Sequence, residues 1–165
     1  MKPIILIITL TLIFSCNTTS EKTDEQAVKN IPEKTEPNIG ALKHKLLEEG
    51  FQTFDYVDEK TGDTVLMQQY FIAFLKSGPN RSQTKEEADS LQALHLAHLG
   101  RMYEEGYADI SGPFGDDGEI RGITIYNVPT LEMADSLANM DPMVKSGRLV
   151  IEIHPWWAAK GFGLR

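Results

Sequence analysis

Cysteine is almost absent from this sequence, since Cys16 is the only one in 165 residues. A single cysteine cannot form a disulfide within the chain, so an internal disulfide framework is excluded. Clusters of basic residues are absent too, and 24 acidic against 16 basic residues give a net charge of −8. An acidic surface repels phosphate backbones, so nucleic acid is not an expected partner.

The N-terminal apolar run is too short to cross a membrane. It extends from Ile4 to Phe14, eleven uncharged residues that follow Met1-Lys2-Pro3. A membrane-spanning helix needs about 20 apolar residues. A short positive start followed by a short apolar run is typical of a secretory signal peptide, which we place at residues 1–15.

The end of this run resembles a bacterial lipobox, Ile13-Phe14-Ser15-Cys16. The resemblance implies cleavage before Cys16, lipidation of Cys16, and anchoring to a membrane of the cell envelope, on its periplasmic or surface face. A soluble secreted protein with an incidental cysteine is the alternative. Residues 16–40 are mostly polar and predict a disordered tether, because they cannot bury enough surface to offset their ordering entropy. Residues 41–165 form the expected folded domain.

The folded region predicts a protein of the α+β class. Helices are expected over residues 41–50, 84–105 and 130–140, and strands over 51–57, 65–75, 107–111, 120–128 and 148–154. From Val65 the order is β-α-β-β-α-β, which predicts a ferredoxin-like antiparallel sheet with helices on one face, preceded by an extra helix and strand. The other sheet face would be bare in a monomer, so a homodimer formed by sheet packing is expected.

A histidine lies in the middle of the apolar face of the second expected helix. With Leu91 at zero on a helical wheel, the apolar face centres near 60° and His95 lies at about 40°. His98, at about 340°, is expected to point toward the rim of that face and to be replaceable. A buried imidazole needs a hydrogen-bond partner, because leaving it unsatisfied costs about 1–3 kcal/mol.

Asp141 is a candidate partner for His95. It precedes Pro142, which favours an extended backbone at Asp141 and suits a helix N-cap. A capping carboxylate can still offer its second oxygen to an imidazole, so capping and pairing with His95 are compatible. A purely structural histidine is the alternative.

Other kinds of site have weaker support. His95 and His98 are three residues apart and could share a metal, but no third ligand is indicated, so no metal is expected. Gly112-Pro113-Phe114-Gly115 lacks the lysine of a phosphate-binding loop, and no Gly-x-Ser-x-Gly motif occurs, so no cofactor is expected either. Trp156-Trp157 could line a pocket or close the end of a barrel.

Several segments carry a recognisable pattern: His95-Leu96-Ala97-His98-Leu99, Glu105-Gly106, Ser111-Gly112-Pro113, Arg121-Gly122 and Asp141-Pro142-Met143-Val144-Lys145-Ser146-Gly147. Together they resemble the YCII-related domain, over about Val65 to Trp157. In that family a histidine on the first helix and the aspartate of the Asp-Pro step form a presumed active-site dyad on a dimeric α+β barrel. The resemblance assigns these positions to His95 and Asp141, and it implies lyase-type chemistry such as dehydrochlorination of aromatic compounds.

Two functions remain open from the sequence. The first is a small envelope enzyme in which Asp141 orients His95 as a general base toward a small organic molecule. The second is a non-catalytic module that binds a small ligand or a partner, in which the same pair is structural. A dyad that can be reached from a cleft favours the enzyme, and a sealed dyad favours the binding module.

Overall fold

The structure, a computed structural model, describes residues 38–164. The expected signal peptide, the lipidation site Cys16 and nearly all of the expected tether lie outside the described residues. Within residues 38–164, no helix combines the length and the apolar character needed to cross a membrane.

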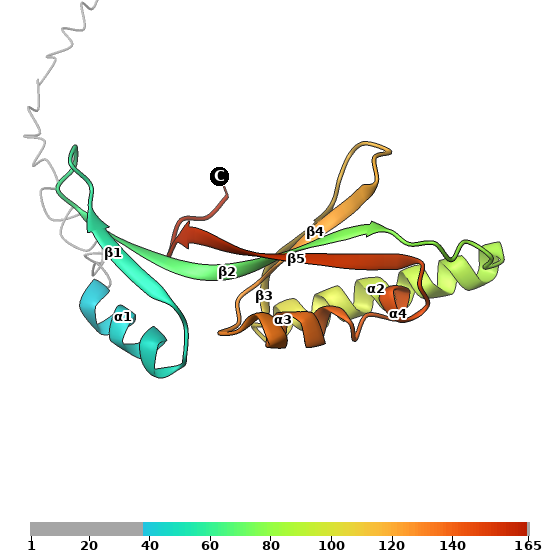
Figure 1. Ribbon diagram of the computed structural model, residues 1–165, viewed down its shortest axis with the longest axis horizontal. Coiled ribbons are helices and arrows are strands. Elements are labelled where there is room, and N and C mark those ends of the chain that lie inside the picture. Colours follow the sequence, from blue (N-terminus) through green and yellow to red (C-terminus); the bar gives the residue numbers. More distant parts are fainter. Residues whose placement is uncertain (1–37, 165) are drawn as a thin grey trace, which may run out of the picture. The chain divides into compact units, whose positions relative to one another are not determined.

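The described residues form four helices and five strands (Figure 1). In chain order these are α1 (Ile39–Glu48), β1 (Thr53–Val57), β2 (Thr64–Ser77), α2 (Lys85–Glu104), β3 (Ala108–Pro113), β4 (Ile120–Tyr126), α3 (Leu131–Ala138), α4 (Pro142–Lys145) and β5 (Leu149–Ala159).

Side chains before the helices fix where the helices begin. Thr84 accepts a hydrogen bond from the Glu87 amide, and the Glu87 side chain accepts one from the Thr84 amide. This capping box, predicted from the sequence, satisfies amides that have no partner inside α2. Asn38 and Thr130 cap α1 and α3 in the same way, with one accepted bond each.

Strand β2 is the centre of an antiparallel sheet. Its residues 71–76 pair with β4 on one side and with β5 on the other, and β3 continues the sheet beyond β4. The order β5-β2-β4-β3 is that of a ferredoxin-like sheet. The first part of β2 pairs with β1, so the N-terminal helix and strand extend the domain as predicted.

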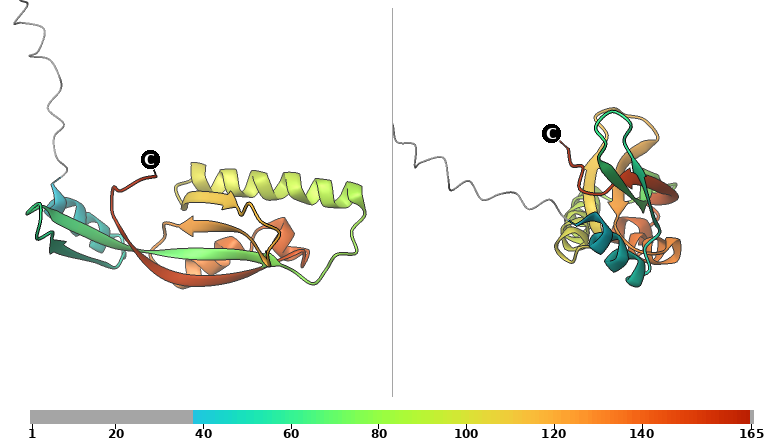
Figure 2. Two further views of the ribbon diagram at one scale, coloured as in Figure 1. Left: turned by 90° about the horizontal axis from the view of Figure 1, so that it is seen from above. Right: turned by 90° about the vertical axis from the view of Figure 1, so that its left-hand side faces the viewer.

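The helices α2 and α3 cover one face of this sheet (Figures 1 and 2). Phe71 and Ala73 of β2 pack in one core cluster with Met102 of α2 and Ala134 of α3. Because side chains alternate along a strand, Ile72 points to the opposite face. The predicted ferredoxin-like α+β fold with helices on one face is therefore confirmed.

Strand β5 is longer than the sequence predicts. The expected strand ends at His154, but the observed one continues through Pro155 to Ala159. Among the described residues, β5 pairs only with β2, so it is an edge strand. An edge strand tolerates proline, because the missing N–H can face away from the neighbouring strand.

Candidate functional site

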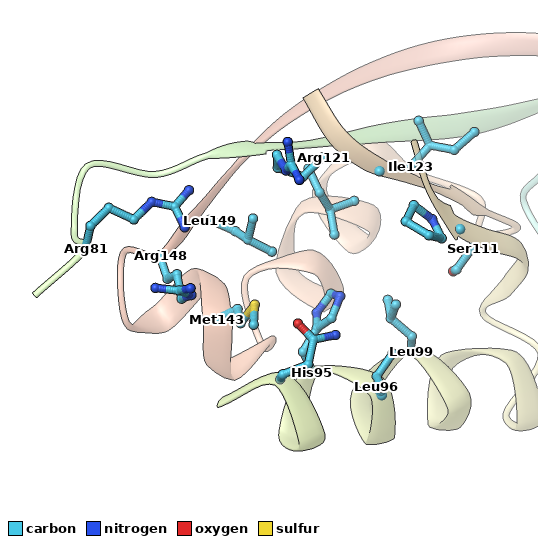
Figure 3. A pocket seen from close by; sticks show the side chains of 15 residues that line it. Arg81, His95, Leu96, Leu99, Ser111, Arg121, Ile123, Met143, Arg148 and Leu149 are labelled. Atoms are coloured by element: carbon cyan, nitrogen blue, oxygen red, sulfur yellow. The ribbon is translucent and has the colours of Figure 1, made fainter. Parts of the chain in front are cut away.

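A cavity of about 410 Å³ opens between α2, the β3–β4 hairpin and the segment from α4 to β5 (Figure 3). A volume of this size suits a small ligand. The side chain of His95 rises from α2 into it. The lining residues are Leu75, Arg81, Gln92, His95, Leu96, Leu99, Ser111, Gly112, Pro113, Arg121, Gly122, Ile123, Met143, Arg148 and Leu149.

The predicted contact between His95 and Asp141 is present. Nδ1 of His95 lies 2.5 Å from Oδ2 of Asp141, a short hydrogen bond between buried side chains. The two residues are 46 positions apart in the chain. The fold therefore brings together the pair that the helical wheel and the Asp-Pro step indicate separately.

The start of α4 fixes the position of Asp141. Asp141 is the N-cap of α4, and Pro142 occupies the first helical turn. Oδ1 of Asp141 accepts a hydrogen bond of 2.8 Å from the Met143 amide. One oxygen thus caps the helix while the other binds the imidazole, so the carboxylate has little freedom to turn away.

The dyad is open to the cavity on one side. The Asp141 side chain is 3% exposed and that of His95 is 11% exposed. Since Nδ1 of His95 is bonded to Asp141, Nε2 is the nitrogen left for a bound molecule. A neutral imidazole that donates from Nδ1 has its free electron pair on Nε2, which is the arrangement of a general base.

The expectation that His98 lies at the rim of α2 is wrong. His98 is only 4% exposed, and its Nδ1 accepts a hydrogen bond of 3.1 Å from Arg101. Leu96 and Tyr103, at about 140° and 120° on the same wheel, widen its apolar side, but they are 58% and 68% exposed. The buried residues of α2 are His95, His98 and Met102, which lie at about 40°, 340° and 20° on the wheel, so the buried face centres near 20° rather than 60°.

Burial changes the acidity of two neighbours of the dyad. It lowers the pKa of His98, against the opposing influence of the Asp141 carboxylate. Burial also raises the pKa of Tyr126, and the charge of Asp141 adds to that rise. Both effects favour uncharged side chains beside Asp141 at neutral pH.

The two histidines do not share a site. The Nδ1 atom of His95 faces Asp141, whereas that of His98 faces Arg101. Within residues 38–164, no group of three or more histidine, cysteine, aspartate or glutamate side chains is placed to hold a metal.

The glycines of the family-like segments allow β3 and β4 to approach closely at the cavity. A Cβ atom on Gly122 would lie 2.7 Å from the backbone oxygen of Gly112, closer than real Cβ contacts allow. Gly112, Pro113 and Gly122 all line the cavity. These residues therefore shape this wall of the cavity and do not form a phosphate-binding loop.

Three arginines of the lining, Arg81, Arg121 and Arg148, were not singled out as site residues by sequence reasoning. They lie far apart in the chain and share no local motif, although the resemblance includes Arg121 without giving it a role. The scarcity of arginine is the one usable signal, since the sequence has five in total and three of them line this cavity.

The tryptophan pair does not line this cavity. Trp156 and Trp157 belong to β5 and pair with Tyr70 and Gln69 of β2. Trp156 and Tyr70 line a second cavity, of about 630 Å³, together with Phe162 of the C-terminal segment. Burial raises the pKa of Tyr70 to about 12, so its hydroxyl stays protonated there.

Comparison with known proteins places the chain in context. The sequence model of the YCII-related domain matches residues 70–157. A solved structure, 5-chloro-2-hydroxyhydroquinone dehydrochlorinase (TftG) from Burkholderia phenoliruptrix AC1100 in complex with 2,5-dihydroxybenzoquinone, is 19% identical. The match has a TM-score of 0.41 and covers 53% of this chain and 92% of that one. No curated protein matches.

Proposed function

Because this chain belongs to the YCII-related domain family, we propose that it is a small enzyme that uses His95 and Asp141 for general acid–base chemistry. The observation that carries the proposal is a buried carboxylate, 2.5 Å from an imidazole that lines a cavity. A carboxylate in this position fixes the tautomer of the imidazole and stabilises its protonated form, which is what a general base requires.

The reaction class that fits is an elimination from a small organic molecule. Nε2 of His95 takes a proton from a carbon atom of the substrate, and the electron pair of that C–H bond forms a double bond to the neighbouring carbon. A leaving group on the neighbouring carbon departs with its bonding electrons. The imidazolium, stabilised by Asp141, then returns its proton to the leaving group or to water.

The walls of the cavity suit such a step. Leu96, Leu99 and Met143 provide apolar surface beside His95. Apolar walls exclude water, which strengthens the electrostatic interactions of a base and of the charge that forms during the reaction.

Deuterium incorporation tests proton abstraction without knowledge of the leaving group. The full-length chain is incubated with a pool of cell metabolites, and the molecules that stay bound are identified by mass spectrometry. Each is then incubated with the protein in D₂O. We expect the wild-type protein to introduce deuterium into a bound molecule or to convert it, and His95→Gln to do neither while keeping its circular dichroism spectrum.

His44→Gln is the matched control, since His44 is an exposed histidine of α1 with a side chain 75% exposed. It should behave as wild type. Deuterium incorporation that survives in His95→Gln would contradict the enzymatic role of His95. Bound molecules that are neither exchanged nor converted by any variant would favour the binding-module function, with the dyad in a structural role.

Attachment to the cell envelope is a second part of the proposal, supported by the lipobox-like residues before Cys16. We expect metabolic labelling with a fatty acid to mark the wild-type chain and to place it in membrane fractions. Cys16→Ser should lose the label and leave those fractions. Unchanged labelling of Cys16→Ser would refute the anchor.

Homodimer formation through the open sheet face is the third part of the proposal. Ile72 and Phe74 point away from the helices and are half-buried, and their cross-strand neighbours on β4 are Ile125 and Ile123. Tyr70 and Trp156 extend this apolar surface, with ring centroids 6.3 Å apart. A contiguous apolar sheet face is typical of an interaction surface, and a second copy offers a matching one.

A further inference from the structure

The cavity around His95 is positively charged although the protein is acidic overall. Its lining contains three arginines and, among the described residues, no aspartate or glutamate. The chain as a whole has a net charge of −8. Acidic side chains thus lie outside the cavity, apart from Asp141, which is behind the imidazole and 2% exposed.

The guanidinium groups of these arginines are not neutralised by nearby carboxylates. Arg148 donates to the amide oxygen of Gln83 at 3.0 Å, and no carboxylate of residues 38–164 forms an ion pair with Arg148 or Arg81. Arg121 donates to the backbone oxygen of Gly118 and lies 3.8 Å from Asp117, a fully exposed side chain. Such an exposed pair is weak, so positive charge remains available.

The arginines and the α2 side chains of the lining occupy different places. In Figure 3, Arg81 and Arg148 enter from the side formed by the segment before α2 and the turn after α4. His95, Leu96 and Leu99 rise from α2 below the cavity. A molecule with a charged end and an apolar body would therefore lie with its charge toward the arginines and its body over α2.

We infer that the cavity binds a small organic carboxylate, with the carboxylate at Arg81 and Arg148, Arg121 nearby, and the apolar body beside Nε2 of His95. Planar guanidinium groups match carboxylate geometry through paired hydrogen bonds. A phosphate ester is the less suitable anion, because phosphate favours the amides of a helix N-terminus, and the first turn of α2, where the capping box already engages amides, is not part of the lining.

This inference rests on the proposed function and gives it a substrate class. When Nε2 of His95 takes a proton from the carbon next to the carboxylate, the electron pair of the C–H bond moves toward the carboxylate oxygens before the leaving group departs. Guanidinium groups that hold the carboxylate also stabilise this additional negative charge. Fixed charges that meet developing charge in this way lower the barrier of the step.

Binding of benzoate to the full-length chain tests the inference by titration calorimetry. Benzyl alcohol has the same ring without the charge, and we expect it to bind at least about tenfold more weakly than benzoate. Arg81→Gln and Arg148→Gln should each weaken benzoate binding by about tenfold. Arg81 makes no side-chain hydrogen bond within the described residues, so Arg81→Gln keeps the test valid if Arg148→Gln fails to fold.

Lys60→Gln removes the same charge from an exposed position in the β1–β2 turn and should leave benzoate binding unchanged. Equal affinities for benzoate and benzyl alcohol, an equal loss in Lys60→Gln, or no measurable benzoate binding would overturn the inference. Tighter binding of phenyl phosphate than of benzoate would overturn the choice of a carboxylate.

The variant His95→Gln separates this inference from the proposed function. It should still bind benzoate more tightly than benzyl alcohol, because the arginines are intact, while it loses proton abstraction. Arginine-dependent benzoate binding in a protein that never exchanges a substrate proton would support the carboxylate site and contradict the enzyme. Exchange of an uncharged substrate that survives Arg81→Gln and Arg148→Gln would contradict the carboxylate site alone.

Discussion

Asp141 carries two separable hydrogen bonds, and substitutions can remove one or both. Asp141→Ala removes the cap of α4 and the bond to His95. A lost N-cap costs about 1 kcal/mol. A lost hydrogen bond to a charged group costs about 2 kcal/mol. We therefore expect the free energy of unfolding of Asp141→Ala to fall by about 3 kcal/mol in urea denaturation.

Asp141→Asn should destabilise the protein much less than Asp141→Ala does, but it should impair proton abstraction by His95 just as severely. Its amide oxygen can keep the bond to the Met143 amide, so only the charge of the bond to His95 is lost, which costs about 1 kcal/mol. Its NH₂ group, however, donates toward Nδ1 of His95. The neutral imidazole must then accept at Nδ1 and carry its proton on Nε2, so the nitrogen facing the cavity cannot act as a base.

The ¹⁵N chemical shifts of the imidazole, measured at about pH 8 where an ordinary imidazole is neutral, distinguish the two tautomers. We expect a proton on Nδ1 of His95 in the wild-type protein and on Nε2 in Asp141→Asn. Equal destabilisation by alanine and asparagine would refute the division of roles between the two oxygens. An unchanged tautomer in Asp141→Asn would refute the assignment of the carboxylate as the group that orients His95.

Three further outcomes are expected. Burial lowers the pKa of His98, so the unfolded chain binds a proton at this residue more readily than the folded protein does. The free energy of unfolding should therefore fall as the pH drops below the ordinary imidazole pKa of about 6.5. Urea denaturation above and below that pH should show a smaller fall for His98→Asn than for the wild-type protein. Gly78→Ala should lower the free energy of unfolding by about 1–3 kcal/mol, since its Cβ would lie 2.8 Å from the backbone carbon of Arg148. Gly100→Ala in α2, where no atom lies within 4 Å of the added Cβ, should raise the free energy of unfolding by up to about 1 kcal/mol in the same assay. Light scattering at concentrations of about tens of micromolar should show a dimer for the wild-type chain and a monomer for Phe74→Glu; a monomeric wild-type chain would contradict the dimer.

Local rules predicted much of the fold because the elements carry their own signals. The capping box at Thr84 marks the start of α2, and the aromatic and β-branched residues of β2 mark the central strand. The pairing of His95 with Asp141 could be inferred because a buried imidazole needs a partner and an N-cap carboxylate has a second oxygen. Each inference uses a requirement that a few neighbouring residues impose.

The features that were missed depend on contacts between distant segments. The burial of His98 depends on which side of α2 packs against the rest of the domain. A helical wheel counts the exposed Leu96 as part of the apolar face and therefore places the centre of that face away from His98. The extension of β5 through Pro155 depends on its place at the sheet edge. The arginine-lined cavity depends on the register of β4 and on the turn after α4, neither of which leaves a pattern in the sequence.

The cap of α4 also makes the dyad observable without any substrate. The Met143 amide is held by the carboxylate that holds His95, and it lies in a buried position. Its hydrogen can exchange with solvent only when the hydrogen bond to that carboxylate is broken. The hydrogen-exchange rate of this one amide therefore measures how often the site opens in the native protein. A ligand in the cavity that restricts the motion of His95 should slow this exchange, while the amides of the distant β1–β2 turn keep their rates.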